Sequence, residues 1–249
     1  MMQETLWTLR HMKHSLRRQI LSWRSDLAAW RRFWDSYQCY KKLAPPDRQP
    51  LLEYLYPCLG DDIGETPIEP VYFYQDSWAF EKIVNQRPEF HVDVGSHHKF
   101  VALLSKVIPV TMVDIRPLPL PLDTLEFRKG SILELPYEDQ SVSSVSSLCV
   151  VEHIGLGRYG DPLDPYGSEK AIEELKRIVQ IGGDLYLSLP LDDENRIYFN
   201  AHRAFKEEYV LRLFEPFQIV ERRYIYGRNF GDQRKHGFGT GCYYLRRRQ

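Results

Sequence analysis

The chain has 249 residues, 43% of them hydrophobic and 27% charged, which is the composition of a soluble globular protein with a sizeable core. Its formal net charge of -1 argues against nucleic acid as a partner, because nucleic-acid-binding domains are usually strongly basic. No apolar run is long enough to span a membrane, and basic residues interrupt the N-terminal region where a signal peptide would be apolar. We therefore expect a cytoplasmic protein without a transmembrane segment.

Four cysteines are spread along the chain, at positions 39, 58, 149 and 242. They include no C-x-x-C pair, and their spacing fits neither a zinc site nor a disulfide framework. We expect them to be reduced thiols.

The first 43 residues form a basic segment with a seven-residue repeat. Nine Lys or Arg and three Asp or Glu give it a net charge of +6, whereas the rest of the chain carries -7. Two apolar rows recur with heptad spacing: Leu9, Leu16, Trp23, Trp30 and Tyr37, and Leu6, Ile20, Leu27 and Trp34. This pattern predicts a long amphipathic helix over residues 1–44, which Pro45 and Pro46 end.

The apolar stripe of this helix has three alternative roles. It could dock on the rest of the chain, or it could form the seam of a homodimer. It could also contact an anionic membrane surface or a partner protein, for which the basic residues and the tryptophans are suited.

The rest of the chain reads as a connector followed by one domain. Residues 45–70 are rich in Pro, Asp and Gly, with one short helix expected near residues 51–56. From residue 71 to residue 249, strand and helix patterns alternate, beginning with a helix that Asp76 or Ser77 would cap and that runs through Val84.

Seven strands are predicted in this domain, over residues 90–94, 110–114, 125–128, 144–150, 184–190, 217–226 and 240–246. Helices are expected between them, near residues 97–106, 168–180 and 206–214. The alternation predicts a doubly wound α/β domain with a mostly parallel sheet. The last two strands are separated only by a Gly-rich stretch, so we expect them to form an antiparallel pair at one edge.

Two acids and a glycine close the first two strands. Asp93-Val94-Gly95-Ser96 ends the first strand, and Asp114 ends the second. Gly95 allows a tight turn and a close approach of the backbone to a ligand, and Asp93 can accept from an ammonium group or from loop amides. An acid at the end of the second strand can accept two hydrogen bonds from ribose hydroxyls. The combination predicts a site for a nucleotide-type cofactor.

A polar loop follows the fourth strand, from Glu152 to Pro165, at the sheet edge where ligands bind in this architecture. His153 is the candidate general base, because the unperturbed pKa of histidine lies near neutrality. Glu152 or Asp161 would orient it, and Arg158 and Tyr159 are candidate contacts of the substrate. The alternative is that Glu152 and His153 only order the loop through hydrogen bonds.

Asn200, His202 and Arg203 follow the fifth strand and could recognise a sugar or a carboxylate on the substrate. The alternative is a polar cap on the next helix. Asp161 and Asp164 could hold a divalent metal together with a neighbouring histidine. The flanking prolines favour rigid turns instead, so we expect no metal.

The order of these motifs resembles the class I S-adenosylmethionine-dependent methyltransferases over about residues 71–249. The matching segments are residues 135–141, 151–154, 174–178 and 182–183. A more specific likeness is to a methyltransferase-like family catalogued as a domain of unknown function, whose members often occur beside sugar-transfer and surface-polysaccharide functions. That likeness lies in residues 74–76, 91–96, 113–117, 151–165 and 199–203.

The resemblance implies S-adenosylmethionine as the cofactor and assigns roles residue by residue. Asp93, Gly95 and Ser96 would face the methionine end of the cofactor. Asp114 would hold the ribose, with Ile115 against the adenine.

The remaining contacts implied by the resemblance come from the next two loops. Ser131 and Ile132 would edge the adenine ring. Cys149, Val150 and Val151 would line the floor near the sulfonium.

Two departures from the usual pattern separate two functional hypotheses. His97-His98-Lys99 stand where later glycines are usual, and Ser131 stands where an Asp often bonds the adenine amino group. The first hypothesis is an enzyme that transfers a methyl group to a small or carbohydrate-type acceptor, at oxygen. The second is a catalytically inactive methyltransferase-like module that associates with a partner through its N-terminal helix. The dense polar loop favours the enzyme, and the crowded glycine loop favours the inactive module.

Overall fold

A computed structural model describes residues 27–248 of the chain. The chain divides into two compact units, Met1–Pro67 and Ile68–Gln249.

The described part of the first unit begins with a helix over residues 27–43 and continues with two short 3-10 helices, η1 (Pro46–Arg48) and η2 (Leu52–Tyr54). Trp30 and Trp34 are 40% and 42% exposed, and their rings stack with centroids 6.5 Å apart. The ring of Tyr37 packs edge-on against Trp34 at 5.5 Å. Trp34, from one heptad row, thus contacts Trp30 and Tyr37, from the other, on one side of the helix, while the repeat positions before Leu27 lie outside the described residues. Over residues 27–248, no helix combines the length and the apolar character needed to cross a membrane.

The second unit begins with helix α2 (Pro70–Gln86), which starts earlier than the sequence predicts. The carboxylate of Glu69 accepts a hydrogen bond from the backbone N–H of Tyr72 at 2.8 Å, and Pro70 occupies the first helical turn, where its missing N–H costs nothing. The prediction of a cap at Asp76 or Ser77 is wrong, because both lie inside the helix. The hydroxyl of Ser77 donates to the carbonyl of Phe73 instead.

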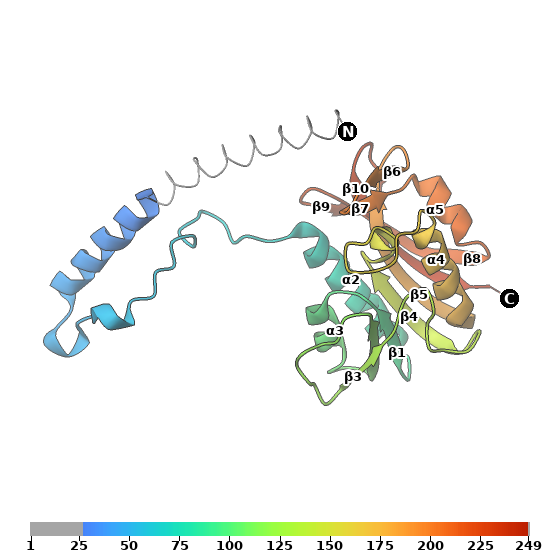
Figure 1. Ribbon diagram of the computed structural model, residues 1–249, viewed down its shortest axis with the longest axis horizontal. Helices are drawn as coiled ribbons and strands as arrows, with labels where there is room; N and C mark the ends of the chain where they lie inside the picture. The colour runs from blue at the N-terminus through green and yellow to red at the C-terminus, as the bar shows by residue number, and fades with distance from the viewer. Residues whose placement is uncertain (1–26, 249) are drawn as a thin grey trace. The chain divides into compact units, whose positions relative to one another are not determined.

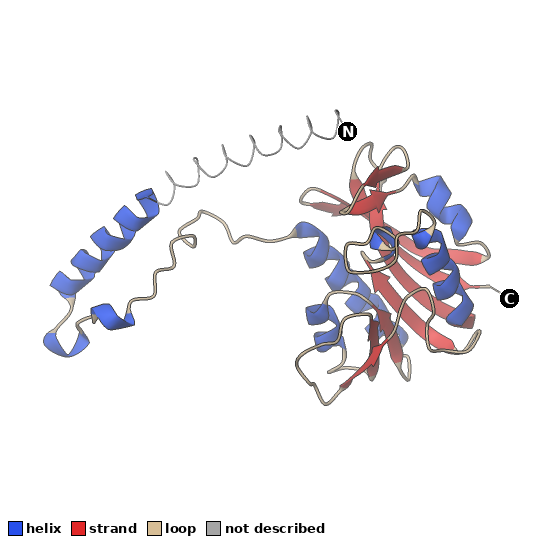
Figure 2. Ribbon diagram, viewed as in Figure 1, coloured by secondary structure: helices blue, strands red, loops and turns tan. Residues whose placement is uncertain are grey.

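The central sheet has eight strands in the order β3-β2-β1-β4-β5-β10-β8-β9 (Figures 1 and 2). Their bounds are β1 (His91–Val94), β2 (Val110–Asp114), β3 (Leu125–Lys129), β4 (Val142–Leu148), β5 (Val179–Leu191), β8 (Phe217–Tyr226), β9 (Asn229–Gly231) and β10 (Gly239–Arg247). The first five in this order pair in parallel, whereas β10 is antiparallel to both β5 and β8. The predicted doubly wound architecture and the antiparallel pair at its end are therefore confirmed. The eighth strand, β9, is a three-residue addition in the Gly-rich stretch, where the sequence predicts no element.

Helices cover both faces of the sheet. On one face, α2 and α3 (His98–Leu104) contribute Trp78, Ile83 and Phe100 to a cluster with Leu148 and Tyr186 of the sheet region. On the other face, the residues from α4 (Gly167–Ile178) and α5 (Glu207–Leu213) pack on a second buried cluster, and they include Ile172, Leu175 and Val210. Each fully buried side chain of this kind contributes about 1.5–3 kcal/mol, so the sheet is fixed from both sides. The carboxyl ends of its parallel strands are left to carry a site.

A small second sheet joins β6 (Arg196–Tyr198) to β7 (His202–Ala204). The sequence predicts neither strand, because three residues are too few to show an alternating pattern. Asn200 occupies the turn of this hairpin with φ of 65°, a left-handed conformation that Asn tolerates better than most residues. Asn200, His202 and Arg203 therefore belong to a hairpin and do not cap α5, which follows Lys206.

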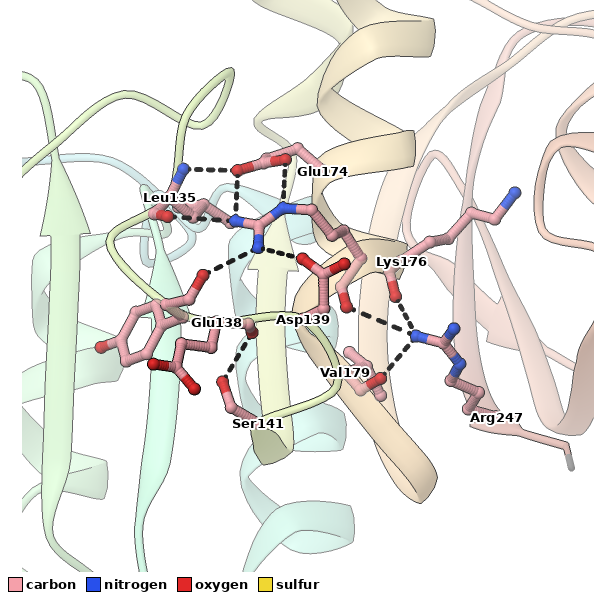
Figure 3. Close-up of polar contacts among 10 residues, drawn as sticks. Leu135, Glu138, Asp139, Ser141, Glu174, Lys176, Val179 and Arg247 are labelled. Atoms are coloured by element: carbon pink, nitrogen blue, oxygen red, sulfur yellow. Dashed lines mark hydrogen bonds and ion pairs between the residues drawn. The ribbon is translucent and has the colours of Figure 1, made fainter.

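Arg177 of α4 fastens the loop between β3 and β4 (Figure 3). Its guanidinium donates to both carboxylate oxygens of Glu174 at 2.8 Å and to the carbonyls of Leu135 and Tyr137. Asp139 provides a further ion pair at 2.8 Å. Nearby, Arg247 donates to the carbonyls of Lys176 and Val179 and ties the end of the chain to the end of α4.

Candidate functional site

A cavity of about 410 Å³ opens at the carboxyl ends of β1, β2 and β4. The predicted site residues that line it are Gly95, Ser96, Asp114, Ile115, Ser131, Ile132, Cys149, Val150, His153, Tyr159 and Asp161. The predicted site residues that do not line it are Asp93, Val151, Glu152, Arg158, Asn200, His202 and Arg203. The fold thus gathers residues from the four loops that follow β1, β2, β3 and β4 around one hollow.

Gly95 makes the turn that forms one wall of the cavity. Its φ of 73° lies in the left-handed region, and a Cβ added to it would lie 3.0 Å from Cγ1 of Val150. A side chain would therefore cost backbone strain and also fill the space beside Val150. The backbone N–H of Gly95 donates to the carbonyl of Val113 at 3.0 Å, which holds the turn against β2.

Asp93 lies behind this turn and does not face the cavity, so its expected contact with the cofactor is corrected. Its side chain is fully buried. Oδ1 accepts from the backbone N–H of Ser96 at 3.0 Å, and Oδ2 accepts from the hydroxyl of Ser146 at 2.5 Å. Burial raises the pKa of Asp93 to about 6, although the hydrogen bonds from Ser146 and Ser96 oppose that rise. Asp93 braces the loop from below.

Asp114 stands at the end of β2 with a side chain that is 11% exposed. Its Oδ1 accepts from the backbone N–H of Arg116 at 2.8 Å, and the Arg116 guanidinium lies 3.6 Å away. Among residues 27–248, Oδ2 has no hydrogen-bond donor, so this oxygen can accept from a ligand hydroxyl. This is the chemistry expected of a ribose-binding acid.

Another part of the lining combines apolar and polar side chains suited to a flat ring. Ile115 and Ile132 line it, and Ile132 is only 6% exposed. The hydroxyl of Ser131 accepts from the backbone N–H of Leu133 at 3.1 Å. Ser131 can still donate its own proton to a ring nitrogen.

The His97-His98 pair, expected to crowd the loop, forms part of the wall. The two rings lie 4.4 Å apart, and His97 also packs against the ring of Tyr72 at 5.1 Å. Burial lowers the pKa of His97, with His98 and Lys99 acting in the same direction. Both histidines line the cavity, and the cavity still has a volume of about 410 Å³ with their side chains in place.

The sequence did not predict a role in the site for Tyr72, Gln75 or Arg116. The first and last of these belong to the site, and Gln75 supports it. Tyr72 and Arg116 line the cavity. Gln75 is fully buried and accepts, through Oε1, from Cys149 Sγ at 3.1 Å and from the Ser188 hydroxyl at 2.7 Å. The sequence signal was the position of Gln75 in one of the segments shared with the uncharacterised family, which singled it out without giving it a role.

Cys149 holds a strained position on the floor of the cavity. It is not a glycine, yet its φ is 53°, immediately after β4 ends. Non-glycine residues in this conformation cluster at functional sites, because the surrounding structure must hold them there. The bond to Gln75 is one such restraint.

Glu152 and His153 follow in the short 3-10 helix η3 (Val151–His153). The side chain of Glu152 is buried and its Oε2 has no hydrogen-bond partner among the described residues. Burial raises the pKa of Glu152 to about 8, so the carboxyl is mostly neutral at pH 7. Its Oε1 lies 3.7 Å from Nε2 of His153.

His153 is fixed by the hairpin β6–β7. Its Nδ1 lies 2.7 Å from the carbonyl oxygen of Ala201, so Nδ1 carries the proton and Nε2 keeps the lone pair. Burial lowers the pKa of His153 to about 4, with the hydrogen bond to Ala201 working against the shift. The same carbonyl accepts from Arg158 at 3.0 Å. Arg158 therefore reinforces the hairpin contact.

Asp161 organises the loop around His153. Its carboxylate accepts from the backbone N–H groups of Gly155 at 2.6 Å, Gly157 at 3.3 Å and Tyr159 at 3.2 Å. Burial alone would raise the pKa of Asp161, but these backbone amides hold it below the usual value. Tyr159 lies beneath the Arg116 guanidinium at 4.3 Å and closes one side of the cavity.

Arg203 does not reach the cavity, so its expected role in substrate binding is corrected. It is 5% exposed, and its guanidinium donates to the carbonyl of Ile154 at 2.5 Å, to Ser168 Oγ at 3.0 Å and to the carbonyl of Asp164 at 3.0 Å. It clamps the polar loop to the start of α4. Over residues 27–248, no group of three or more His, Cys, Asp or Glu side chains is placed to hold a metal ion.

Solved structures with this arrangement of strands and helices are S-adenosylmethionine-dependent methyltransferases and relatives. The N-methyltransferase NodS of Bradyrhizobium japonicum, in complex with S-adenosylhomocysteine, is 16% identical with a TM-score of 0.53, over 86% of this chain and 98% of NodS. The 1,6-didemethyltoxoflavin-N1-methyltransferase of Burkholderia thailandensis, also with bound S-adenosylhomocysteine, is 15% identical with a TM-score of 0.51, over 74% and 93%. The cyclase SpnF is 13% identical with a TM-score of 0.51, over 70% and 81%.

The second unit therefore has the class I S-adenosylmethionine-dependent methyltransferase fold, as the sequence resemblance predicts. Residues 135–227 match DUF268, described as a Caenorhabditis protein of unknown function, in agreement with the likeness to an uncharacterised family. No curated protein matches the chain.

Proposed function

We propose that the protein is an S-adenosylmethionine-dependent methyltransferase that binds its cofactor in the 410 Å³ cavity. The observation that carries the proposal is the pairing of the Gly95 turn with the carboxylate of Asp114 across one hollow at the ends of β1 and β2. The volume lies within the range of about 300–1,000 Å³ that small-molecule sites occupy.

The residues present fit this cofactor. Oδ2 of Asp114 would accept from the ribose hydroxyls, and Ile115 and Ile132 would enclose the adenine. The cavity also lacks a Cβ at Gly95, which leaves room for the amino-acid end of the cofactor.

The other predicted cofactor contacts fall into two groups. Ser131 would donate to the adenine, and Ser96 would lie near the methionine end. Cys149 and Val150 would line the floor near the sulfonium, whereas Val151 is fully buried and supports them from behind. When bound, S-adenosylmethionine supplies an activated methyl group.

His153 is the proposed general base. Its Nδ1 donates to Ala201, which leaves the Nε2 lone pair to take a proton from an acceptor hydroxyl. The low pKa of about 4 keeps the ring neutral at pH 7 and also makes it a weaker base than an ordinary histidine. Glu152 lies 3.7 Å from Nε2, beyond hydrogen-bond distance, so the carbonyl of Ala201 would orient the ring and Asp161 would hold the loop that carries Glu152 and His153. Positioning of the acceptor oxygen would supply much of the rate.

The acceptor is proposed to be a small or carbohydrate-type molecule methylated at oxygen. The support is a group of rings beside the catalytic loop: Tyr198 lies 5.0 Å from His202, and His202 lies 5.6 Å from Phe238. Phe238 is 52% exposed, and stacking on such rings would hold an acceptor ring while Asn200 and Arg158 bond its polar edge. Burkholderia 1,6-didemethyltoxoflavin-N1-methyltransferase, which shares the fold, was solved with the small molecule 1,6-didemethyltoxoflavin bound.

The test is methyl transfer from labelled S-adenosylmethionine to a panel of glycosides and hydroxylated small molecules. His153→Ala should abolish transfer and leave the affinity for S-adenosylhomocysteine within about twofold, because none of the proposed contacts with the cofactor comes from His153. Full transfer by the variant would remove His153 from the role of base.

A second candidate function is a partner-binding module without catalysis. It is favoured by the exposed rings of Trp30 and Trp34, with the half-buried Tyr37 beside them, on the helix over residues 27–43. Light scattering of the full chain and of a chain starting at Pro45 would test whether this segment makes a homodimer. If truncation does not change the number of chains per particle, a membrane surface or another protein remains as the partner.

A further inference from the structure

A buried chain of hydrogen bonds runs beneath the loop that the proposed cofactor contacts. It joins Ser144, His91, Ser146 and Asp93, each at most 2% exposed. Ser144 Oγ lies 2.8 Å from Nδ1 of His91, and Ser146 Oγ lies 2.8 Å from Nε2 of the same ring. Ser146 Oγ is also 2.5 Å from Oδ2 of Asp93.

Strand alternation explains why these four side chains meet. β1 and β4 are parallel neighbours with Asp93 opposite Ser146. Residues two apart on a strand share a face, so His91 and Asp93 of β1 face Ser144 and Ser146 of β4. The four hydrogen-bonded side chains thus form a polar strip within an otherwise apolar layer.

The direction of each proton follows from the chain itself. Ser146 donates its single hydroxyl proton to Asp93, so it must accept from His91, which fixes the proton of the ring on Nε2. The Nδ1 lone pair then accepts from Ser144. Burial lowers the pKa of His91 to about 3, in keeping with a neutral ring. Every donor points toward the Asp93 carboxylate, and hydrogen bonds aligned in this way strengthen one another.

The chain of hydrogen bonds ends at the Gly95–Ser96 loop. Oδ1 of Asp93 accepts from the backbone N–H of Ser96 at 3.0 Å, and Ser96 Oγ accepts from the backbone N–H of Leu148 at 2.9 Å. Gly95 and Ser96 line the cavity, but His91, Asp93 and Ser146 do not. An apolar residue at position 91 would fill the core without the cost of burying an imidazole. The polar chain therefore has a use other than packing.

We propose that His91 and Ser146 are positioning residues, which hold Asp93 in the orientation that shapes the Gly95–Ser96 loop for the cofactor. This inference rests on the proposed function for its consequence, a cofactor affinity that depends on Ser146. Its structural claim, the ordering of the loop, stands apart from that function.

A matched pair of variants tests the inference, because both serines bond the same imidazole and only one bonds Asp93. Ser146→Ala removes the link to Asp93, whereas Ser144→Ala removes a bond of similar length on the far side of the ring. Hydrogen exchange at the Ser96 amide should become roughly tenfold faster or more in Ser146→Ala and change by less than about twofold in Ser144→Ala. Calorimetry with S-adenosylhomocysteine should show the same contrast in affinity.

Thermal denaturation of both variants separates positioning from stability. Both should lose stability, because each leaves a ring nitrogen of His91 with one bond fewer. Equal effects of the two variants on Ser96 exchange, or no effect of Ser146→Ala, would overturn the inference.

If Ser146→Ala does not fold, His91→Asn replaces it, since its shorter side chain cannot bond both serines. The same faster exchange at Ser96 is expected, and unchanged exchange in a folded His91→Asn protein would overturn the inference. If the wild-type protein binds no S-adenosylhomocysteine, the proposed function fails, while the exchange comparison still decides the role of His91 and Ser146.

Discussion

The ring of His153 and the carbonyl of Ala201 are joined by a hydrogen bond of 2.7 Å across 48 positions of sequence. This contact fastens the loop after β4 to the turn of the hairpin β6–β7. Two separate sequence motifs, residues 152–165 and residues 199–203, are thereby joined, and only the first contributes side chains to the cavity lining. The proposed base and the proposed acceptor-binding rings are consequently held by the same contact.

Replacing Asp114 should weaken cofactor binding without unfolding the protein. Asp114→Ala removes the carboxylate whose Oδ2 would accept from ribose hydroxyls, and the expected loss is about 1–3 kcal/mol of binding free energy for S-adenosylhomocysteine. Glu126→Ala, at an exposed position of β3, is the control and should leave the affinity unchanged. Calorimetric titration measures both, and an unchanged affinity in Asp114→Ala would rule out the ribose contact.

Gly95→Ala tests the close approach at the cofactor turn, with Gly182→Ala as its control. Both glycines have positive φ, 73° and 77°, so both substitutions should cost about 1–2 kcal/mol of stability. Only at Gly95 would the new Cβ meet a neighbour, Val150 at 3.0 Å, whereas nothing lies within 4 Å at Gly182. The affinity for S-adenosylhomocysteine should fall in Gly95→Ala alone, and equal affinities in the two variants would contradict the proposed approach.

Glu152→Gln should make the protein more resistant to unfolding at high pH. Because burial raises the pKa of Glu152 from 4.5 to about 8, its contribution to stability is fully present below pH 4.5 and is lost as the pH rises toward 8. Gln cannot ionise, so the variant should match the wild type near pH 5 and exceed it by roughly 2–4 kcal/mol at pH 8.5. Urea unfolding at several pH values measures the difference.

Glu174→Gln should change the stability of the fold in the opposite direction and serves as the comparison for Glu152→Gln. The Arg177 side chain lowers the pKa of Glu174, so this carboxylate stabilises the fold above pH 4.5 and less as the pH falls. The variant should be less stable than the wild type at pH 7. A Glu152→Gln protein that loses stability in parallel with it would show that Glu152 is paired and ionised.

Arg203→Met should destabilise the domain by about 2–4 kcal/mol, because it leaves the part-buried carbonyl of Ile154 without its donor and removes the bonds to Ser168 Oγ and to the carbonyl of Asp164. Arg196→Met is the matched control: that side chain is 50% exposed and its ion pair with Asp192 is worth less than about 1 kcal/mol. Thermal denaturation compares the two. Equal stability losses would contradict the structural role given to Arg203.

Most of the fold could be predicted from the sequence, because long strands carry a readable apolar pattern. The strand over residues 217–226 has the predicted bounds, and Asp93, Gly95 and Asp114 come at the ends of predicted strands. The hairpin β6–β7 and strand β9 could not be predicted, since three-residue strands show no period.

The direction in which a polar side chain points was harder to predict from the sequence than the strands and helices. Asp93 and Arg203 lie close in sequence to residues that line the cavity. The sequence cannot show that Asp93 bonds Ser146 and that Arg203 bonds the carbonyl of Ile154 instead of a ligand. Both side chains form hydrogen bonds with residues that are distant in the sequence. Gln75 was missed as a support of the floor for the same reason, because its contact with Ser188 spans 113 positions.

The most direct test of the account is a calorimetric titration of the wild-type protein with S-adenosylhomocysteine. Saturable binding at one site per chain is expected, with weaker binding by Asp114→Ala. No heat at a ligand concentration of about 1 mM, where even a binding free energy near -4 kcal/mol would be visible, would contradict the assignment of the cavity.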